Sequence, residues 1–148
     1  MSASEDLAAL LEAVPYARFL GVRLGFEEER LTASLPFAES LIGNPLLPAL
    51  HGGVIGALLE IAAIGALCAE IGLEPLPKAI TFTIEYRRSG RPVATRARAS
   101  VTKLGRNVAN VSANAWQDDE TRPIAIAHGH FLLGQARENT QALLKPGP

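Results

Sequence analysis

The sequence has few cysteine and aromatic residues. Cys68 is its one cysteine, so no disulfide can form within the chain, which fits a reducing compartment such as the cytoplasm. Aromatic residues make up 5% of the chain and charged residues 20%, against 48% hydrophobic residues. This balance argues against a disordered, collagen-like or coiled-coil chain. The length of 148 residues is enough for one domain with a buried core.

A hydrophobic run long enough to cross a membrane is also missing. The longest apolar run spans residues 54–69 and is interrupted only by Glu60. It is shorter than the roughly 20 residues that a membrane span needs, and it carries a carboxylate near its middle. The N-terminus has Glu5 and Asp6 where an export signal would have basic residues. We therefore predict a cytoplasmic protein, without membrane contact, in which this run is a buried helix.

The net charge of −1 conceals a strongly basic segment. Residues 78–106 contain eight basic residues and one acidic residue, a local charge of +7 that the rest of the chain offsets with −8. Such a segment indicates an anionic ligand. Nucleic acid is a poor candidate, because the aromatic residues Phe82 and Tyr86 fall on the apolar side of a predicted strand and not among the arginines.

Hydrophobic periodicity and turn residues predict the elements of the first half. Residues 6–14 have leucines at helical spacing, and Pro15 ends that helix. Two strands are predicted at residues 22–27 and 30–36. Residues 41–50 are rich in glycine and proline and are predicted to be a loop. The apolar helix then runs from residue 54 to about residue 71, where Gly72 and Pro75 end it.

The second half of the chain predicts a sheet. Alternating apolar and polar residues, with short turns between them, indicate four strands at residues 80–86, 92–103, 106–116 and 123–133. An antiparallel sheet wrapped around one long central helix satisfies the order of elements, so we predict an α+β fold with a single domain over residues 1–148. Residues 1–18 would be a helical N-terminal extension and residues 135–148 a flexible tail. An open sheet edge favours self-association as a dimer or tetramer.

Glu60 is the most informative polar residue. An ionised carboxylate inside an apolar helix is costly unless it is paired or hydrogen-bonded. Catalytic sites hold such carboxylates, although an exposed helix stripe or an ion pair with an arginine of the sheet would explain Glu60 equally well.

His51, Gly52 and Gly53 precede the same helix. Glycines at a helix start allow a ligand to approach the backbone, and the free N–H groups there attract negative charge. Such an amide can stabilise the oxyanion of an acyl-transfer intermediate, although an ordinary glycine-rich helix start explains the pattern too. Gly52 and Glu60 lie eight residues apart, about 12 Å along the helix. To act on one carbonyl carbon, they must come from two chains of a dimer.

These motifs resemble those of the hotdog thioesterases of the phenylacetate-pathway (PaaI-like) family. The resemblance is carried by residues 51–53 (HGG), the acid Glu60 in an Ala/Leu/Ile-rich helix, residues 80–92 with the segment RRSGRP, and residues 105–109 (GRNVA). It extends over residues 19–133. It implies a hotdog fold and hydrolysis of an acyl-CoA thioester with a small aryl or medium-length acyl group, without a cofactor.

The resemblance also implies the role of each catalytic residue. Gly52 would provide the backbone N–H that polarises the thioester carbonyl, and Glu60 of the partner subunit would act as general base or as nucleophile. His51 would orient the loop. Asn44 resembles the Asn or Gln that holds the water or thioester, although its interval to His51 is one residue longer here.

One expected group is missing. Many members of the family have a hydroxyl that positions the attacking water, and the corresponding positions here are Ile64 and Ala79. Thr81 or Thr83 would have to replace it. Without this hydroxyl, a non-catalytic acyl-CoA binding or regulatory module is an alternative. An enoyl-CoA hydratase is a weaker alternative, because residues 43–51 lack the aspartate that the hydratase motif needs.

The basic segment supplies candidates for substrate binding. Arginine and lysine hold phosphates such as those of coenzyme A. We predict a substrate site formed by Gly53, Arg88, Lys103 and Arg106. Arg96 and Arg98 are expected on a solvated strand face. His128 and His130 share a strand face but lack further ligands, so no metal site is predicted.

Overall fold

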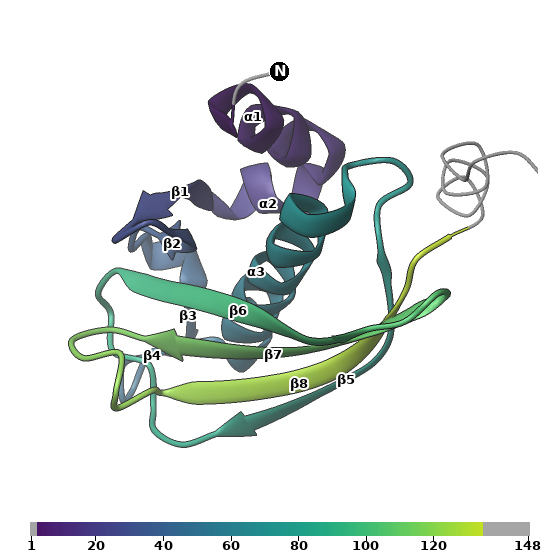
Figure 1. The fold of residues 1–148 in the computed structure, drawn as a ribbon. Coiled ribbons are helices and arrows are strands. Elements are labelled where there is room, and N and C mark those ends of the chain that lie inside the picture. Colours follow the sequence, from purple (N-terminus) through teal and green to yellow (C-terminus); the bar gives the residue numbers. More distant parts are fainter. Residues whose placement is uncertain (1–2, 135–148) are drawn as a thin grey trace, which may run out of the picture.

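The computed structural model describes residues 3–134. Its centre is a six-stranded antiparallel sheet in the order β1-β2-β6-β7-β8-β5, with one long helix, α3, packed against one face (Figure 1). The strands are β1 (Arg23–Glu27), β2 (Arg30–Leu35), β5 (Lys78–Tyr86), β6 (Thr95–Leu104), β7 (Val108–Trp116) and β8 (Ala125–Leu132). The predicted α+β fold, an antiparallel sheet around one central helix, is confirmed.

The helix α3 (Gly52–Ile71) forms the centre of the core. Leu58, Leu59 and Leu67 are fully buried against the sheet and its neighbours. The helix ends at Gly72, whose N–H donates to the carbonyl of Cys68 (2.8 Å). The expectation that no run is long enough to cross a membrane is wrong by length and composition, because α3 extends beyond the apolar run to 20 residues, but 67% of its most apolar window is buried inside the protein. The interpretation of this run as a buried helix therefore agrees with the structure.

Two helices precede the sheet, where the sequence predicted one. α1 (Ala3–Ala13) is followed directly by α2 (Pro15–Leu20); α1 packs against the edge strand β1 and α2 packs against α3 (Figure 1). Pro15 was expected only to end a helix. It also begins one, because proline lacks the N–H that would have no partner in a first helical turn. Gly21 then ends α2 in the left-handed conformation (φ 82°).

Residues 41–50 are not only a loop. After a short 3₁₀ turn (Glu39–Leu41), β3 (Ile42–Asn44) and β4 (Ala49–Leu50) form a small hairpin. The two prolines that suggested a loop lie in the turn between the strands, where no ladder hydrogen bond is lost. The hairpin is tied to the start of α3, since the N–H of His51 donates to the carbonyl of Leu41 (2.9 Å).

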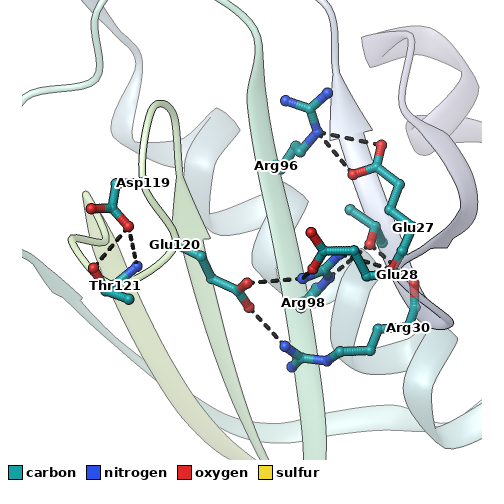
Figure 2. A network of polar contacts seen from close by, with 9 residues as sticks. Glu27, Glu28, Arg30, Arg96, Arg98, Asp119, Glu120 and Thr121 are labelled. Carbon is teal, nitrogen blue, oxygen red and sulfur yellow. Dashed lines mark hydrogen bonds and ion pairs between the residues drawn. The ribbon is translucent and has the colours of Figure 1, made fainter.

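The prediction that Arg98 lies on a solvated face is wrong. Its side chain is 4% exposed. It donates to Thr32 Oγ1 (2.8 Å), to the carbonyl of Glu27 (2.9 Å) and to the carboxylate of Glu120 (2.8 Å) (Figure 2). Its guanidinium also lies 5.3 Å from the centroid of the Trp116 ring. Arg96, two residues earlier, pairs with Glu27 (3.1 Å) and stays half exposed.

The cover over Arg98 comes from the turn between β1 and β2. The two turn residues, Glu28 and Glu29, have φ values of 52° and 62°, which side chains other than glycine adopt at a cost. The contact from Arg98 to the carbonyl before this turn, and its ion pair with Glu28 (3.6 Å), hold the turn in place.

Candidate active site

The start of α3 is built around His51. His51 is the N-cap residue, and its Nδ1 accepts a hydrogen bond from the N–H of Gly53 (2.9 Å). Because Nδ1 is an acceptor, the neutral ring carries its proton on Nε2. The motif needs its glycines. A Cβ on Gly53 would lie 2.9 Å from His51 Nδ1, and a Cβ on Gly43 would lie 2.6 Å from the Cα of His51.

Gly52 presents a free backbone donor. Within residues 3–134, no acceptor meets its N–H. Its carbonyl, in contrast, accepts a hydrogen bond from the hydroxyl of Tyr86 (2.7 Å). A free N–H at a helix N-terminus attracts developing negative charge. Sequence reasoning did not assign Tyr86 to the site, because its position in an alternating strand indicated only an apolar side chain.

A cleft of about 390 Å³ lies next to Gly52. Its walls come from the end of β4, the first turns of α3 and the segment after β5, and they include Tyr86 and Arg88. The side chain of Arg88 forms no ion pair within the described chain, whereas Arg87 pairs with Glu85 (3.2 Å). The structure therefore brings together Gly52 and Arg88, two of the predicted site residues, with Gly53 and His51 beside them.

Glu60 lies two turns further along α3. It is half-buried and, among residues 3–134, its carboxylate has no hydrogen bond or ion pair. An ion pair with an arginine of the sheet, one of the alternatives, is therefore not what the structure shows. Within one chain Glu60 and Gly52 are separated by about 12 Å along the helix, so the two do not converge on one point.

Lys103 and Arg106 lie at the other end of the sheet. Lys103 is close to the end of β6, and Arg106 is in the turn before β7. Strand register places this turn near the Lys78 end of β5, whereas the cleft is at the Tyr86 end. One chain alone does not bring these two residues to Arg88.

Asn44 is an exposed residue at the end of β3. Its Oδ1 accepts a hydrogen bond from the N–H of Leu46 (3.0 Å). This contact forms the turn of the hairpin, while its neighbour Gly43 packs against His51. Asn44 therefore lies next to a residue that contacts His51, and its side-chain oxygen is occupied by the hydrogen bond of the turn.

The threonines of β5, expected as substitutes for the missing hydroxyl, lie on the face of the strand away from α3. Phe82 and Ile84 face the core and α3, so Thr81 and Thr83 point to the opposite face of the strand. There, Thr81 Oγ1 is hydrogen-bonded to His130 Nδ1 (2.8 Å). Among residues 3–134, no group of three or more potential metal ligands lies together.

Fold and site together define a class of protein. An antiparallel sheet packed on one long helix, with the HGG motif at the start of that helix, is the hotdog architecture. The family model described as "Thioesterase superfamily" matches residues 47–124. The chain belongs to this superfamily, and it is a thioester hydrolase. The predicted resemblance to PaaI-like hotdog thioesterases is confirmed.

Individual relatives agree with this assignment. The medium/long-chain acyl-CoA thioesterase YigI of Escherichia coli K12 is 28% identical over 136 residues, covering 82% of this chain and 86% of YigI. The E. coli PaaI protein of the phenylacetic acid degradation operon has a TM-score of 0.70 at 20% identity, covering 88% of this chain and 96% of PaaI. A Bacillus halodurans protein in complex with CoA has a TM-score of 0.75 at 23% identity, covering 89% and 88%. The two solved structures show the shared fold.

Proposed function

We propose that the protein hydrolyses acyl-CoA thioesters in a site shared by two subunits. Water attacks the carbonyl carbon of the thioester while Glu60 of the partner subunit accepts its proton. The carbonyl oxygen gains negative charge and is stabilised by the N–H of Gly52. The C–S bond then breaks, and the CoA thiolate takes up the proton. The same carboxylate could instead attack directly, with water releasing the acyl group from a mixed anhydride.

One observation carries this proposal. Among residues 3–134, an N–H without an acceptor at the start of α3 borders a cleft, and a half-buried carboxylate without a partner lies on the same helix. An unpaired carboxylate among apolar residues is a candidate for general base catalysis. The donor and the base lie too far apart in one chain, so the proposal requires a dimer.

The open edge of β5 supports such a dimer. β5 is an outer strand of the sheet, and Ile80 on it is 54% exposed. Exposed strand edges with apolar side chains are prone to pair with another chain. Antiparallel pairing of β5 with its copy across a two-fold axis would also run the two α3 helices in opposite directions. Glu60 of each subunit would then approach Gly52 of the other.

The same arrangement gives the separated basic residues a common role. In an antiparallel β5 pair, the Lys78 end of one strand lies next to the Tyr86 end of the other. Lys103 and Arg106 of one subunit would therefore be on the side of the partner subunit's cleft, where Arg88 lies. Phosphates of coenzyme A are suitable ligands for such a group of cations. Asn44 would assist at the thioester through its free amide group.

The acyl group is proposed to be medium-length or a small aryl group. The small residue Ala57 on α3 is half-buried and suits either group, whereas Gly56 is filled by Ile84, whose Cδ1 would lie 2.8 Å from a Cβ there. The name of YigI refers to medium and long chains and that of PaaI to phenylacetic acid degradation. Because Thr81 and Thr83 face away from α3, no threonine of β5 positions the water, and we expect modest turnover. If turnover is absent, the non-catalytic acyl-CoA binding module is the remaining candidate.

The first experiment is CoA release over a panel of phenylacetyl, hydroxybenzoyl, short-chain and longer acyl thioesters. Glu60→Gln should lower kcat about 10²- to 10⁴-fold, as expected for loss of a general base, while the fold is retained. Glu70→Gln, an exposed glutamate of the same helix, is the matched control and should have wild-type activity. Unchanged turnover in Glu60→Gln would remove this residue from the mechanism. A fully active monomer in sedimentation would contradict the shared site.

A second experiment concerns the phosphates. Arg106→Ala should raise KM for an acyl-CoA much more than KM for the corresponding acyl-pantetheine, which lacks the nucleotide phosphates. The expected change is about tenfold, the loss of one charge-assisted hydrogen bond. Arg122→Ala, an exposed arginine in the turn before β8, is the control. Equal effects on both substrates would show that Arg106 does not bind a phosphate.

A further inference from the structure

The peptide group between Gly52 and Gly53 is held at both of its polar ends. The carbonyl oxygen of Gly52 accepts from the Tyr86 hydroxyl (2.7 Å), and the N–H of Gly53 donates to His51 Nδ1 (2.9 Å). One partner comes from the end of β5, 34 residues away in the sequence, and the other from the N-cap. This peptide plane therefore cannot rotate without breaking a hydrogen bond.

The donor of the proposed oxyanion site belongs to the peptide immediately before it. The N–H of Gly52 points in a direction that depends on the dihedral angles of Gly52, and glycine has the widest range of these angles. Fixing the following peptide removes much of that freedom. The ring of Tyr86 also lies close to Gly52, since a Cβ on Gly52 would be in van der Waals contact (3.4 Å) with both its Cζ and its hydroxyl oxygen.

The backbone of Tyr86 is held by the sheet, while its side chain is 51% exposed. The next residue, Arg87, donates its N–H to the carbonyl of Ile124 (2.8 Å), and β5 is paired with β8 as far as Tyr86 and Ala125. The hydroxyl is thus carried by the sheet and not by the helix. Its contact links the edge strand to the first turn of α3, where the free donor lies.

We propose that Tyr86 is a positioning residue that orients the Gly52 N–H toward the thioester carbonyl. This inference rests on the proposed function, in which that N–H stabilises the oxyanion. Preorganised donors are effective because they need no reorientation when the charge develops. If the Gly52 peptide were mobile, its N–H would have to reorient as the oxyanion forms. The stabilisation of the transition state would then fall more than the affinity for the substrate.

The kinetic test uses Tyr86→Phe, which keeps the ring and removes the hydroxyl. We expect kcat to fall about tenfold, the equivalent of one hydrogen bond, with KM changed less than about twofold. The chain has two tyrosines, and the other, Tyr16, stacks against Phe19 on the exposed side of α2. Tyr16→Phe is therefore the matched control and should leave kcat unchanged. A Tyr86→Phe enzyme with wild-type kcat, or with a raised KM alone, would overturn the inference.

A spectroscopic test separates positioning from a general effect on the fold. The probe is a ketone analogue of an acyl-CoA, in which CH2 replaces the thioester sulfur, and the readout is its carbonyl stretching band when bound. In the wild-type protein the band should shift to lower frequency because the Gly52 N–H polarises the carbonyl. In Tyr86→Phe the band should move back toward its value in water and broaden. An identical band in both proteins would overturn the proposal.

The two tests also distinguish this inference from the proposed function. Glu60-dependent hydrolysis together with an unchanged Tyr86→Phe enzyme would leave the proposed function standing and refute the role of Tyr86. Absence of hydrolysis in the wild type would refute the proposed function, whereas the band of the bound ketone would still decide whether Tyr86 orients the donor.

Discussion

Arg98 and Glu60 are both charged side chains among apolar neighbours, but they differ in their polar partners. Arg98 is 4% exposed and has a hydrogen-bond or ion-pair partner for each part of its guanidinium that the fold covers: Thr32, Glu27, Glu28 and Glu120 (Figure 2). Glu60 is half-buried, and its carboxylate has no partner within residues 3–134.

The difference separates structure from function. A buried cation with satisfied donors holds several elements together, here the β1–β2 turn, β6 and the segment before β8. Its charge is compensated by these partners and is not available to a ligand. A carboxylate without a partner remains available for a substrate, a water molecule or a second subunit. The sequence alone did not give this separation, because Arg98 was expected on a solvated strand face and an ion pair with an arginine of the sheet would have explained Glu60 equally well.

The largest effect on stability should come from Arg98. Arg98→Met keeps an unbranched apolar side chain but removes the charge and its hydrogen bonds to Thr32 and to the carbonyl of Glu27, while Glu120, 31% exposed, keeps its ion pair with Arg30 (2.9 Å). Each hydrogen bond to a charged group contributes about 1.5–3 kcal/mol. We expect a loss of this size in the free energy of unfolding, measured by urea denaturation. The folded fraction should retain wild-type kcat, because Arg98 does not contact the cleft.

Arg96→Ala is the matched control for this substitution. Its ion pair with Glu27 is half exposed, and such pairs contribute about 0–1 kcal/mol. If the two substitutions cost the same, burial and multiple contacts do not explain the role of Arg98. A large loss of kcat in folded Arg98→Met would contradict the claim that Arg98 is structural and Glu60 catalytic.

Glu60 should behave in the opposite way. Glu60→Gln keeps the shape of the side chain and removes a charge from an apolar helix, so the free energy of unfolding should stay the same or rise by up to about 1 kcal/mol. Urea denaturation of this variant beside Glu70→Gln measures the effect. A destabilisation of more than about 1 kcal/mol would mean that Glu60 has a structural partner, and it would weaken its assignment as the catalytic base.

Local patterns explain which parts could be predicted from the sequence. The apolar run and the alternating strands specify α3 and the order of the sheet, because burial of one helix face or strand face sets the hydrophobic period. The HGG motif and Glu60 were found as a motif at fixed spacing. These signals depend on residues close together in the sequence.

Contacts between distant residues explain what could not be predicted. Arg98 appeared solvated because its cover, the acidic turn at Glu28, comes from 70 positions earlier. Tyr86 appeared to be an apolar side chain, since nothing near it in the sequence shows that its hydroxyl reaches the carbonyl of Gly52. The strands β3 and β4 are too short for a periodic signal. In each case, packing of distant segments determines the result.

Asp119 is a third charged residue to compare, and the effect of its hydrogen-bond partners is expected to be the smallest. It is a fully exposed carboxylate, and the hydroxyl of Thr121 (2.8 Å) and then the N–H of Thr121 (2.9 Å) donate to its Oδ1, which lowers its pKa below the ordinary value (Figure 2). A pKa that is lower in the folded state stabilises the fold above the pKa of the unfolded chain. This stabilisation is lost as the pH falls through the folded-state value.

Thr121→Val removes the hydroxyl donor and keeps the N–H, so the pKa of Asp119 should rise toward its ordinary value. An NMR titration of the carboxyl carbon measures this directly, with Thr102→Val, in a distant strand, as the control. An unchanged pKa would mean that the hydroxyl does not contribute and the backbone N–H sets it, whereas a rise would show that hydrogen-bond partners tune even an exposed charge.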